Sequence, residues 1–221
     1  MKPETKESVE ARRAGAEVGV AELDHAEWER ARAVRLTRYW SGAQAPPERH
    51  AEARIIWTDE ALSVRFICRQ SEPLIVNPSP RLERKTIGLW ERDVCEIFIA
   101  PDTTDPERYF EFEAAPTGEW LDLAIRQTPD ERLTDWDYHS GMTTAARIDV
   151  DSITIAIRIP LSALIQTNSR RPPRAGDTWR VNLYRCIGGG DARGYLAWQP
   201  TETPEPSFHA PHKFGWLSFG K

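Results

Sequence analysis

Apolar and polar residues alternate with a period of two over many short segments of this chain, and turns rich in Pro, Gly and Asp separate these segments. Such alternation is typical of β-strands, because successive side chains point to opposite faces of a sheet. The segments predicted as strands are 54–57, 62–69, 94–100, 109–115, 120–126, 143–150, 152–159, 178–187, 195–198 and 214–219. The predicted helical turns are short, at residues 24–28 and 161–165. The pattern predicts an all-β fold, a two-sheet antiparallel β-sandwich of immunoglobulin-like or jelly-roll type with few short helical turns.

The first residues lack this pattern. Residues 1–17 are mostly polar and charged, which predicts a flexible N-terminal tail. The remaining residues, 18–221, contain neither an internal repeat nor a strong linker, and their length suffices for one sandwich with a full core. We therefore expect a single domain over residues 18–221.

The strand predicted at residues 109–115 carries the most informative chemistry. Tyr109, Glu111 and Glu113 fall on one face, and Phe110, Phe112 and Ala114 fall on the other. One face can therefore pack in a core while the other presents a Tyr and carboxylates, which we interpret as a solvated or Arg-paired face. A Trp beside carboxylates on a rigid sheet suits a sugar, because the ring covers C–H surface and the acids accept hydrogen bonds from hydroxyls.

Composition narrows the functional classes. The net charge is −5 and the isoelectric point is about 5.6, so the chain has no electrostatic footprint for nucleic acid or an anionic membrane. Its apolar runs are far below membrane-spanning length, and the N-terminus has no apolar signal region, so we expect a cytoplasmic protein unless a signal was removed. Nine Trp residues are a high number for 221 positions. They favour an aromatic-rich core, a ligand platform, or both.

Cysteine and acidic residues offer further candidates. Cys68, Cys95 and Cys186 each lie in a predicted strand without a CxxC partner, which indicates buried free thiols. The acidic turns 102–107 and 130–137 offer hard oxygen ligands for a structural calcium ion, although a solvated acidic loop explains them equally well.

Several segments occur in an order that resembles a known family. They are IIWTDEALSVRFIC, LWERDVCEIFIAPD, YFEFEAAPTGEWLD, IPLSAL, PPRAGDTWRVNLYR and FHAPHKFGWLSF. This order is similar to that of family 9 carbohydrate-binding modules, specifically the stand-alone family 9-like proteins of bacteria, over roughly residues 20–219. The resemblance implies a β-sandwich that binds a terminal, reducing-end sugar of plant polysaccharides, such as xylan or cellulose, between two aromatic rings. Bound calcium is common in that family.

The resemblance assigns roles to individual positions. Trp90 matches the first stacking ring, Glu96 matches a carboxylate that accepts sugar hydroxyls, and Phe208 falls where the second stacking Trp lies. Glu111 stands where sugar-binding members have an Arg, which reverses a charge in the pocket. The predicted site is a shallow cleft with Trp90 and Phe208 facing each other, Glu96 at the floor, and Tyr109 and Glu111 on the adjacent strand.

Other classes of function remain open at this point. Glu111 and Glu113 are two residues apart on one strand, roughly 6.5–7 Å at Cα, which is compatible with the carboxylate pair of a glycoside hydrolase. A haem-binding sandwich would need an axial Met, and Met142 lies near His139. A protein-interaction role could use the loop that carries Trp136 and Tyr138. The sequence leaves the oligomeric state open.

Overall fold

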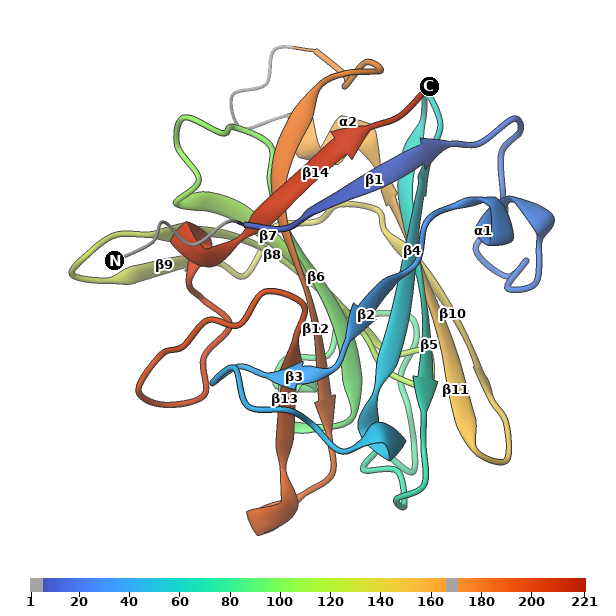
Figure 1. Ribbon diagram of the computed structural model, residues 1–221, viewed down its shortest axis with the longest axis vertical. Helices are drawn as coiled ribbons and strands as arrows, with labels where there is room; N and C mark the ends of the chain where they lie inside the picture. The colour runs from blue at the N-terminus through green and yellow to red at the C-terminus, as the bar shows by residue number, and fades with distance from the viewer. Residues whose placement is uncertain (1–5, 166–170) are drawn as a thin grey trace.

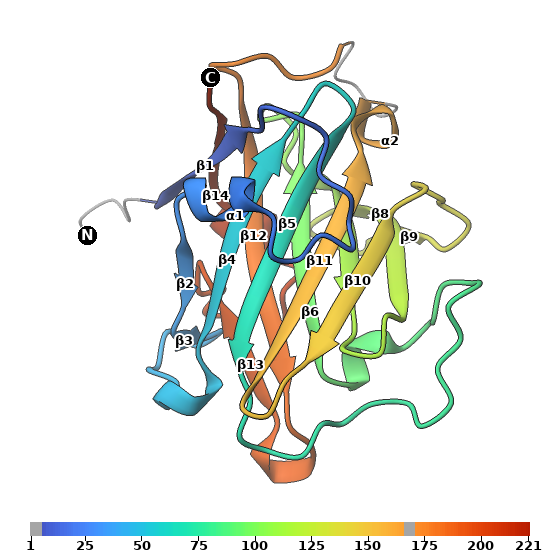
Figure 2. The same ribbon diagram turned by 90° about the vertical axis from the view of Figure 1, so that its right-hand side faces the viewer.

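The protein is a two-layered β-sandwich, as the alternation predicts (Figures 1 and 2). This computed structural model describes residues 6–165 and 171–221. The first layer consists of β10 (Thr143–Ile148), β11 (Ser152–Pro160), β5 (Ala61–Arg69), β4 (Ala51–Trp57) and β2 (Val34–Leu36). The second consists of β14 (Gly215–Phe219), β12 (Thr178–Ile187), β6 (Val94–Ala100), β7 (Arg108–Ala114), β8 (Trp120–Gln127) and β9 (Arg132–Asp135), with β13 (Gly194–Ala197) and β3 (Arg38–Tyr39) at its side.

Short helices connect the strands. They are α1 (Ala26–Arg30) and α2 (Leu161–Ile165), with single 3₁₀ turns η1 (Pro47–Arg49), η2 (Leu89–Glu91), η3 (Gly190–Ala192) and η4 (Pro211–Lys213). Within the described ranges, neither helix approaches the length and apolarity that would carry it across a membrane. The predicted turn at 161–165 is confirmed as α2, whereas the predicted turn at 24–28 begins two residues later, with His25 as its N-cap.

Residues 8–13 correct the expectation of a flexible tail over residues 1–17. They form β1 (Ser8–Arg13), whose first four residues pair in parallel with β14 and whose last two residues pair in parallel with β4. Val9 and Ala11 are buried in the core. The strand therefore links the two layers, and this pairing satisfies its backbone groups. Residues 1–5 of the expected tail, and residues 166–170, lie outside the described ranges.

The main core lies between the two layers. Ile153, Ile155, Ile157 and Ile159 of β11 all point into it, which confirms the apolar face predicted for that strand. From the second layer, Cys95, Ile97 and Ile99 of β6 and Phe110 and Phe112 of β7 contribute to the same core. The structure therefore confirms which side chains of these strands were predicted to face the core.

The second layer also buries part of its outer face, which positions the site described below. Val94, Phe98, Tyr109, Tyr184 and Phe214 form a second apolar cluster there. The loop between β13 and β14, residues 198–214, covers this cluster. Side chains of β12 hold this C-terminal loop in place. Tyr184 Oη donates to the carbonyl of Phe208 at 3.0 Å, and Asn182 Nδ2 donates to the carbonyl of Gln199 at 2.8 Å.

Candidate functional site

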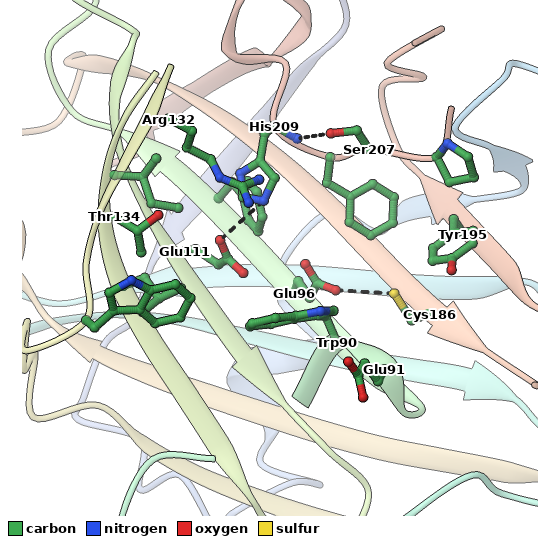
Figure 3. A pocket seen from close by; sticks show the side chains of 16 residues that line it. Trp90, Glu91, Glu96, Glu111, Arg132, Thr134, Cys186, Tyr195, Ser207 and His209 are labelled. Atoms are coloured by element: carbon green, nitrogen blue, oxygen red, sulfur yellow. Dashed lines mark hydrogen bonds and ion pairs between the residues drawn. The ribbon is translucent and has the colours of Figure 1, made fainter. Parts of the chain in front are cut away.

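A pocket of about 450 Å³ opens on the outer face of the second layer, beside the C-terminal loop (Figure 3). Arg132 and Thr134 of β9 line one side, Tyr195 of β13 and Ser207 line the other, and Glu96 and Glu111 lie between them (Figure 3). Its size falls in the range of small-molecule sites. Four of the five residues predicted for the site line this pocket, namely Trp90, Glu96, Glu111 and Phe208.

Trp90 is held at the pocket by backbone contacts. It lies in η2, which follows Gly88, and the φ of +81° at Gly88 favours glycine because that conformation strains other residues. Arg193 Nη2 donates to the carbonyls of Trp90 and Arg92 at 2.5 and 2.7 Å. The Trp90 side chain remains 37% exposed. The ring is therefore fixed on its backbone side and open toward a ligand.

Trp136 is a pocket residue that sequence reasoning did not assign to this site. It follows β9, is 47% exposed, and its ring centroid lies 6.3 Å from that of Trp90 with 43° between the planes. Two rings that enclose a sugar would need about 7 Å between their planes, twice a normal contact distance of ~3.5 Å. Trp90 and Trp136 therefore form one continuous aromatic wall. The sequence indicated that the loop carrying Trp136 is exposed. It did not indicate that this loop lies beside Trp90.

Phe208 differs from the role predicted for it. Only 8% of it is exposed, and its ring stacks on Tyr184 with 4.0 Å between centroids and 11° between planes. Tyr195 contacts it edge-on at 6.1 Å. Phe208 therefore lines the pocket mainly as part of the second apolar cluster.

Tyr109 lies below the pocket. The residue is 1% exposed, its ring stacks near Phe98 at 5.8 Å, and its hydroxyl lies 2.8 Å from Nδ1 of His209. The prediction that Tyr109 faces the ligand is therefore wrong, because His209 of the C-terminal loop covers it. Burial raises the pKa of Tyr109 well above its ordinary value, so the phenol stays protonated in its contact with His209.

His209 and Arg132 flank Glu111 at the pocket (Figure 3). Burial lowers the pKa of His209 to about 3, so its imidazole is neutral, and Nε2 lies 3.9 Å from Glu111 Oε2 without forming an ion pair. Burial raises the pKa of Glu111, and its contact with Glu113 and the positive charge of Arg132 lower it by less. β9, which lies beyond β8 in the same sheet, thus supplies a guanidinium beside the acid that replaces the Arg expected at position 111.

The pocket floor is a cluster of buried acids. Glu96, Glu111 and Glu113 are 2%, 3% and 0% exposed, and one oxygen of each lies within 4.8 Å of the others. The interpretation of Glu111 and Glu113 as a solvated or Arg-paired face is therefore wrong. Burial, followed by the charge of Glu111, raises the pKa of Glu96 to about 8, and burial raises the pKa of the other two carboxyls as well. Cys186 Sγ lies 3.3 Å from Glu96 Oε1, as a dashed line marks in Figure 3.

The remaining candidates lie apart from the pocket. Tyr138, expected with Trp136 on an interaction loop, packs on Phe110 at 5.1 Å at the edge of the main core. Met142 is buried in that core, where its side chain packs between the sheets and is not available as an axial ligand of haem. Glu113 does not line the pocket, so Glu111 and Glu113 do not flank a bound ligand as a hydrolytic pair would.

Two carboxylates of the acidic turn 102–107 have local partners. Asp102 Oδ1 accepts from the backbone and hydroxyl of Thr104, and Asp105 Oδ2 pairs with Arg126 Nη1 at 3.0 Å. Within residues 6–165 and 171–221, the one group of three or more acids, His or Cys close enough to share an ion is Glu96, Glu111 and Glu113. An exposed aromatic wall beside buried oxygen acceptors can bind a ligand that has both apolar C–H surface and hydroxyl groups.

Comparison with known proteins gives a consistent set of relatives. The model of carbohydrate-binding family 9 matches residues 22–219 of the chain. None of the curated proteins matches it. The solved structures include a proposed carbohydrate-binding protein from Bacteroides uniformis, which has 19% sequence identity and a TM-score of 0.77, with 97% of this chain and 100% of that chain covered.

Two further structures are family 9 carbohydrate-binding modules from Caldicellulosiruptor kristjanssonii. The complex with cellotriose has a TM-score of 0.66 and 15% identity, and covers 97% of this chain and 94% of that chain. The complex with glucose has a TM-score of 0.64 and 14% identity, and covers 97% of each chain. At these identities the similarity shows that the fold is shared.

Proposed function

Because this chain belongs to carbohydrate-binding family 9, we propose that its pocket binds a terminal sugar unit of an oligosaccharide or polysaccharide without catalysing a reaction. The observation that carries this proposal is the position of the Trp90–Trp136 wall beside the carboxyl groups of Glu96 and Glu111. A pyranose ring presents C–H groups on its faces and hydroxyls around its edge. The Trp90–Trp136 wall can stack on the C–H face, and the carboxyl groups of Glu96 and Glu111 can hydrogen-bond the hydroxyls.

In this proposal the sugar lies against one side of the aromatic wall rather than between two separate rings. Hydroxyls at its inner edge donate to Glu96 and Glu111, while Arg132 donates to oxygens at its outer edge. Shallow sites of this kind bind at micromolar to millimolar dissociation constants, roughly −4 to −8 kcal/mol.

The acidic floor also restricts the ligand. A uronic acid would bring a carboxylate toward the buried carboxyl groups of Glu96 and Glu111, and its charge would repel theirs wherever no cation neutralises them. Neutral sugars are therefore preferred. The glucose and cellotriose complexes of the Caldicellulosiruptor modules support a glucose unit as the first ligand to test.

The test is calorimetric titration with glucose, cellotriose, xylobiose and glucuronic acid. We expect measurable binding of at least one neutral sugar and weaker binding of glucuronic acid. Trp90→Ala should lower the affinity by about tenfold, about 1.4 kcal/mol. The matched control is Trp216→Ala, which removes a half-exposed Trp on β14 that stacks on Arg180 outside the pocket. Sugar binding that Trp90→Ala leaves unchanged would contradict the proposed site.

A further inference from the structure

The register of the second layer places like charges together at the pocket floor. Glu96 of β6 lies directly opposite Glu113 of β7, and Glu111 lies two residues away on the same face. Like charges at directly opposed positions destabilise a sheet, and removal from water makes each charge more costly. All three carboxyls are fully buried or nearly so. The fold therefore maintains an arrangement that repels itself unless something neutralises it.

The same layer gives its other buried acids partners. Asp93 accepts from the backbone nitrogens of Ile75 and Gly188, at 3.3 and 2.8 Å. Asp122 pairs with Lys85 Nζ at 2.8 Å and accepts from Ser140. Glu119 accepts hydrogen bonds from Asn77, Thr86 and Thr117. These three buried acids each have a hydrogen-bond donor or a cationic side chain as a partner.

The glutamate cluster differs from these three acids. Both oxygens of Glu113 and Oε2 of Glu111 are buried and have no hydrogen-bond partner. Burial is the largest cause and raises the pKa values of both Glu111 and Glu113. Their contact with each other lowers the pKa of Glu111 and raises that of Glu113, and the charges of Arg132 and Arg193 lower the two values by less than burial raises them. Buried acceptors without partners are rare in folded proteins and point to an absent proton, water or ion.

The spacing of the oxygens fits one cation. Calcium lies 2.3–2.6 Å from its oxygen ligands, so two ligands on opposite sides of the ion are about 4.6–5.2 Å apart. One oxygen from each Glu lies within 4.8 Å of the others, inside that span. Because Glu96 and Glu111 also line the pocket, an ion held here would face it with coordination positions still open.

We propose that Glu96, Glu111 and Glu113 bind a single divalent cation of the oxygen-preferring class, with calcium the best fit, and that its open side coordinates hydroxyl groups of the sugar. The role in sugar binding rests on the proposed function, whereas the cation site does not. Calcium fits best because it accepts six to eight ligands in flexible geometry, while magnesium requires near-ideal octahedral geometry at shorter distances. The site also differs from the acidic turn 102–107, where Asp102 and Asp105 already have local partners.

The first experiment measures the ion alone. Protein stripped with chelator is titrated with calcium, magnesium and manganese by calorimetry, and with terbium by luminescence sensitised by Trp90 and Trp136 at the pocket. We expect one calcium site per chain. Glu113→Gln should weaken calcium binding at least tenfold, while Asp130→Asn, in the exposed acidic turn, should leave it unchanged.

Thermal unfolding separates loss of the ion from loss of the fold. In chelator, Glu113→Gln should melt at the same temperature as the wild type or higher, because the neutral amide has nearly the shape of the carboxyl group and cannot carry a buried negative charge. Added calcium should raise the melting temperature of the wild type and not that of the variant. Absence of binding by all three divalent ions would overturn the proposal and identify protons as the neutralising species.

The second experiment measures sugar affinity with calcium and with chelator. We expect the affinity to fall at least tenfold in chelator. Unchanged sugar affinity in chelator, with calcium binding intact, would overturn the proposed coordination of sugar by the ion. Calcium binding without binding of any sugar would contradict the proposed function and leave the ion site established.

Discussion

Trp136 extends the stacking surface of Trp90, with 6.3 Å between the ring centroids and 43° between the ring planes. The two rings come from different parts of the chain, one from η2 before β6 and the other from the loop after β9. A tilted pair presents more continuous apolar area than either ring alone. Because neither ring needs to move far to contact a sugar, little conformational freedom is lost on binding.

Trp136→Ala should therefore weaken sugar binding by about tenfold, about 1.4 kcal/mol, without unfolding the protein. Nearly half of the side chain is exposed, so its removal leaves no large cavity. Calorimetric titration with the best sugar ligand checks the affinity, and the melting temperature checks the fold.

Phe208→Leu is the companion variant, because it keeps most of the apolar volume while removing the ring that stacks on Tyr184. We expect a smaller loss of affinity than for Trp136→Ala. The reverse order, with Phe208→Leu the more damaging, would favour the original prediction of a sugar held between Trp90 and Phe208.

The strands of the site could be predicted from the sequence because their side chains alternate strictly. Phe110 and Phe112 point into the core and Glu111 points to the opposite face, as period two requires. What alternation cannot show is what covers a face. Residues far along the chain, His209 among them, bury Tyr109 and Glu111, and no local pattern near position 110 encodes that contact.

β1 was missed for a related reason. Only Val9 and Ala11 mark its apolar face, and the surrounding residues are charged. Its stability comes from parallel pairing with β14 and β4, which are distant in sequence. In contrast, β11 has four Ile residues on one face and was predicted correctly.

The apolar face of β11 leads to a prediction about stability. Ile155→Ala or Ile157→Ala should lower the free energy of unfolding by about 2–5 kcal/mol, because each side chain is fully buried and its truncation leaves a cavity. Urea unfolding provides the measurement. Ile148→Ala, on the exposed part of β10, is the matched control and should cost far less. Equal losses for the buried and the exposed Ile would contradict the assigned face.

Cys68 and Cys95 lead to a prediction about oxidation. Their Sγ atoms lie 3.4 Å apart, one on β5 and the other on β6, so a bond between them would join the two layers. Both thiols are fully buried and out of reach of an oxidant in solution, so the bond should form during refolding rather than in the folded protein. Refolding with oxidised glutathione, which takes up the two electrons and both protons as reduced glutathione, should lower the number of free thiols from three to one.

This disulfide would close a loop of 27 residues and stabilise the fold by about 3–4 kcal/mol. Thiol titration and urea unfolding check both effects. Cys95→Ser should abolish them, while Cys186→Ala should retain the disulfide. Three free thiols after oxidative refolding would show that the pair stays reduced.

The buried Glu96 leads to a prediction about pH in protein kept free of divalent ions by chelator. Its pKa is about 8 when folded, against an ordinary value of 4.5, chiefly because burial disfavours the charged form. Between pH 4.5 and 8, Glu96 therefore holds a proton in the folded state that it has released in the unfolded state. The resulting stability is fully present below pH 4.5 and is lost as the pH rises through 8.

Between pH 7 and 8 the free energy of unfolding should thus fall, by up to about 1.4 kcal/mol per pH unit for each proton held. His209 does not interfere in this window, because its lowered pKa makes stability rise with pH only below its ordinary value of 6.5. Urea unfolding at pH 7.0, 7.5 and 8.0 in chelator is the measurement, and Glu96→Gln should reduce the slope by the share of one proton, because Glu111 and Glu113 also have raised pKa values. A wild-type stability that stays level or rises across this window would show that Glu96 is already ionised in the folded protein.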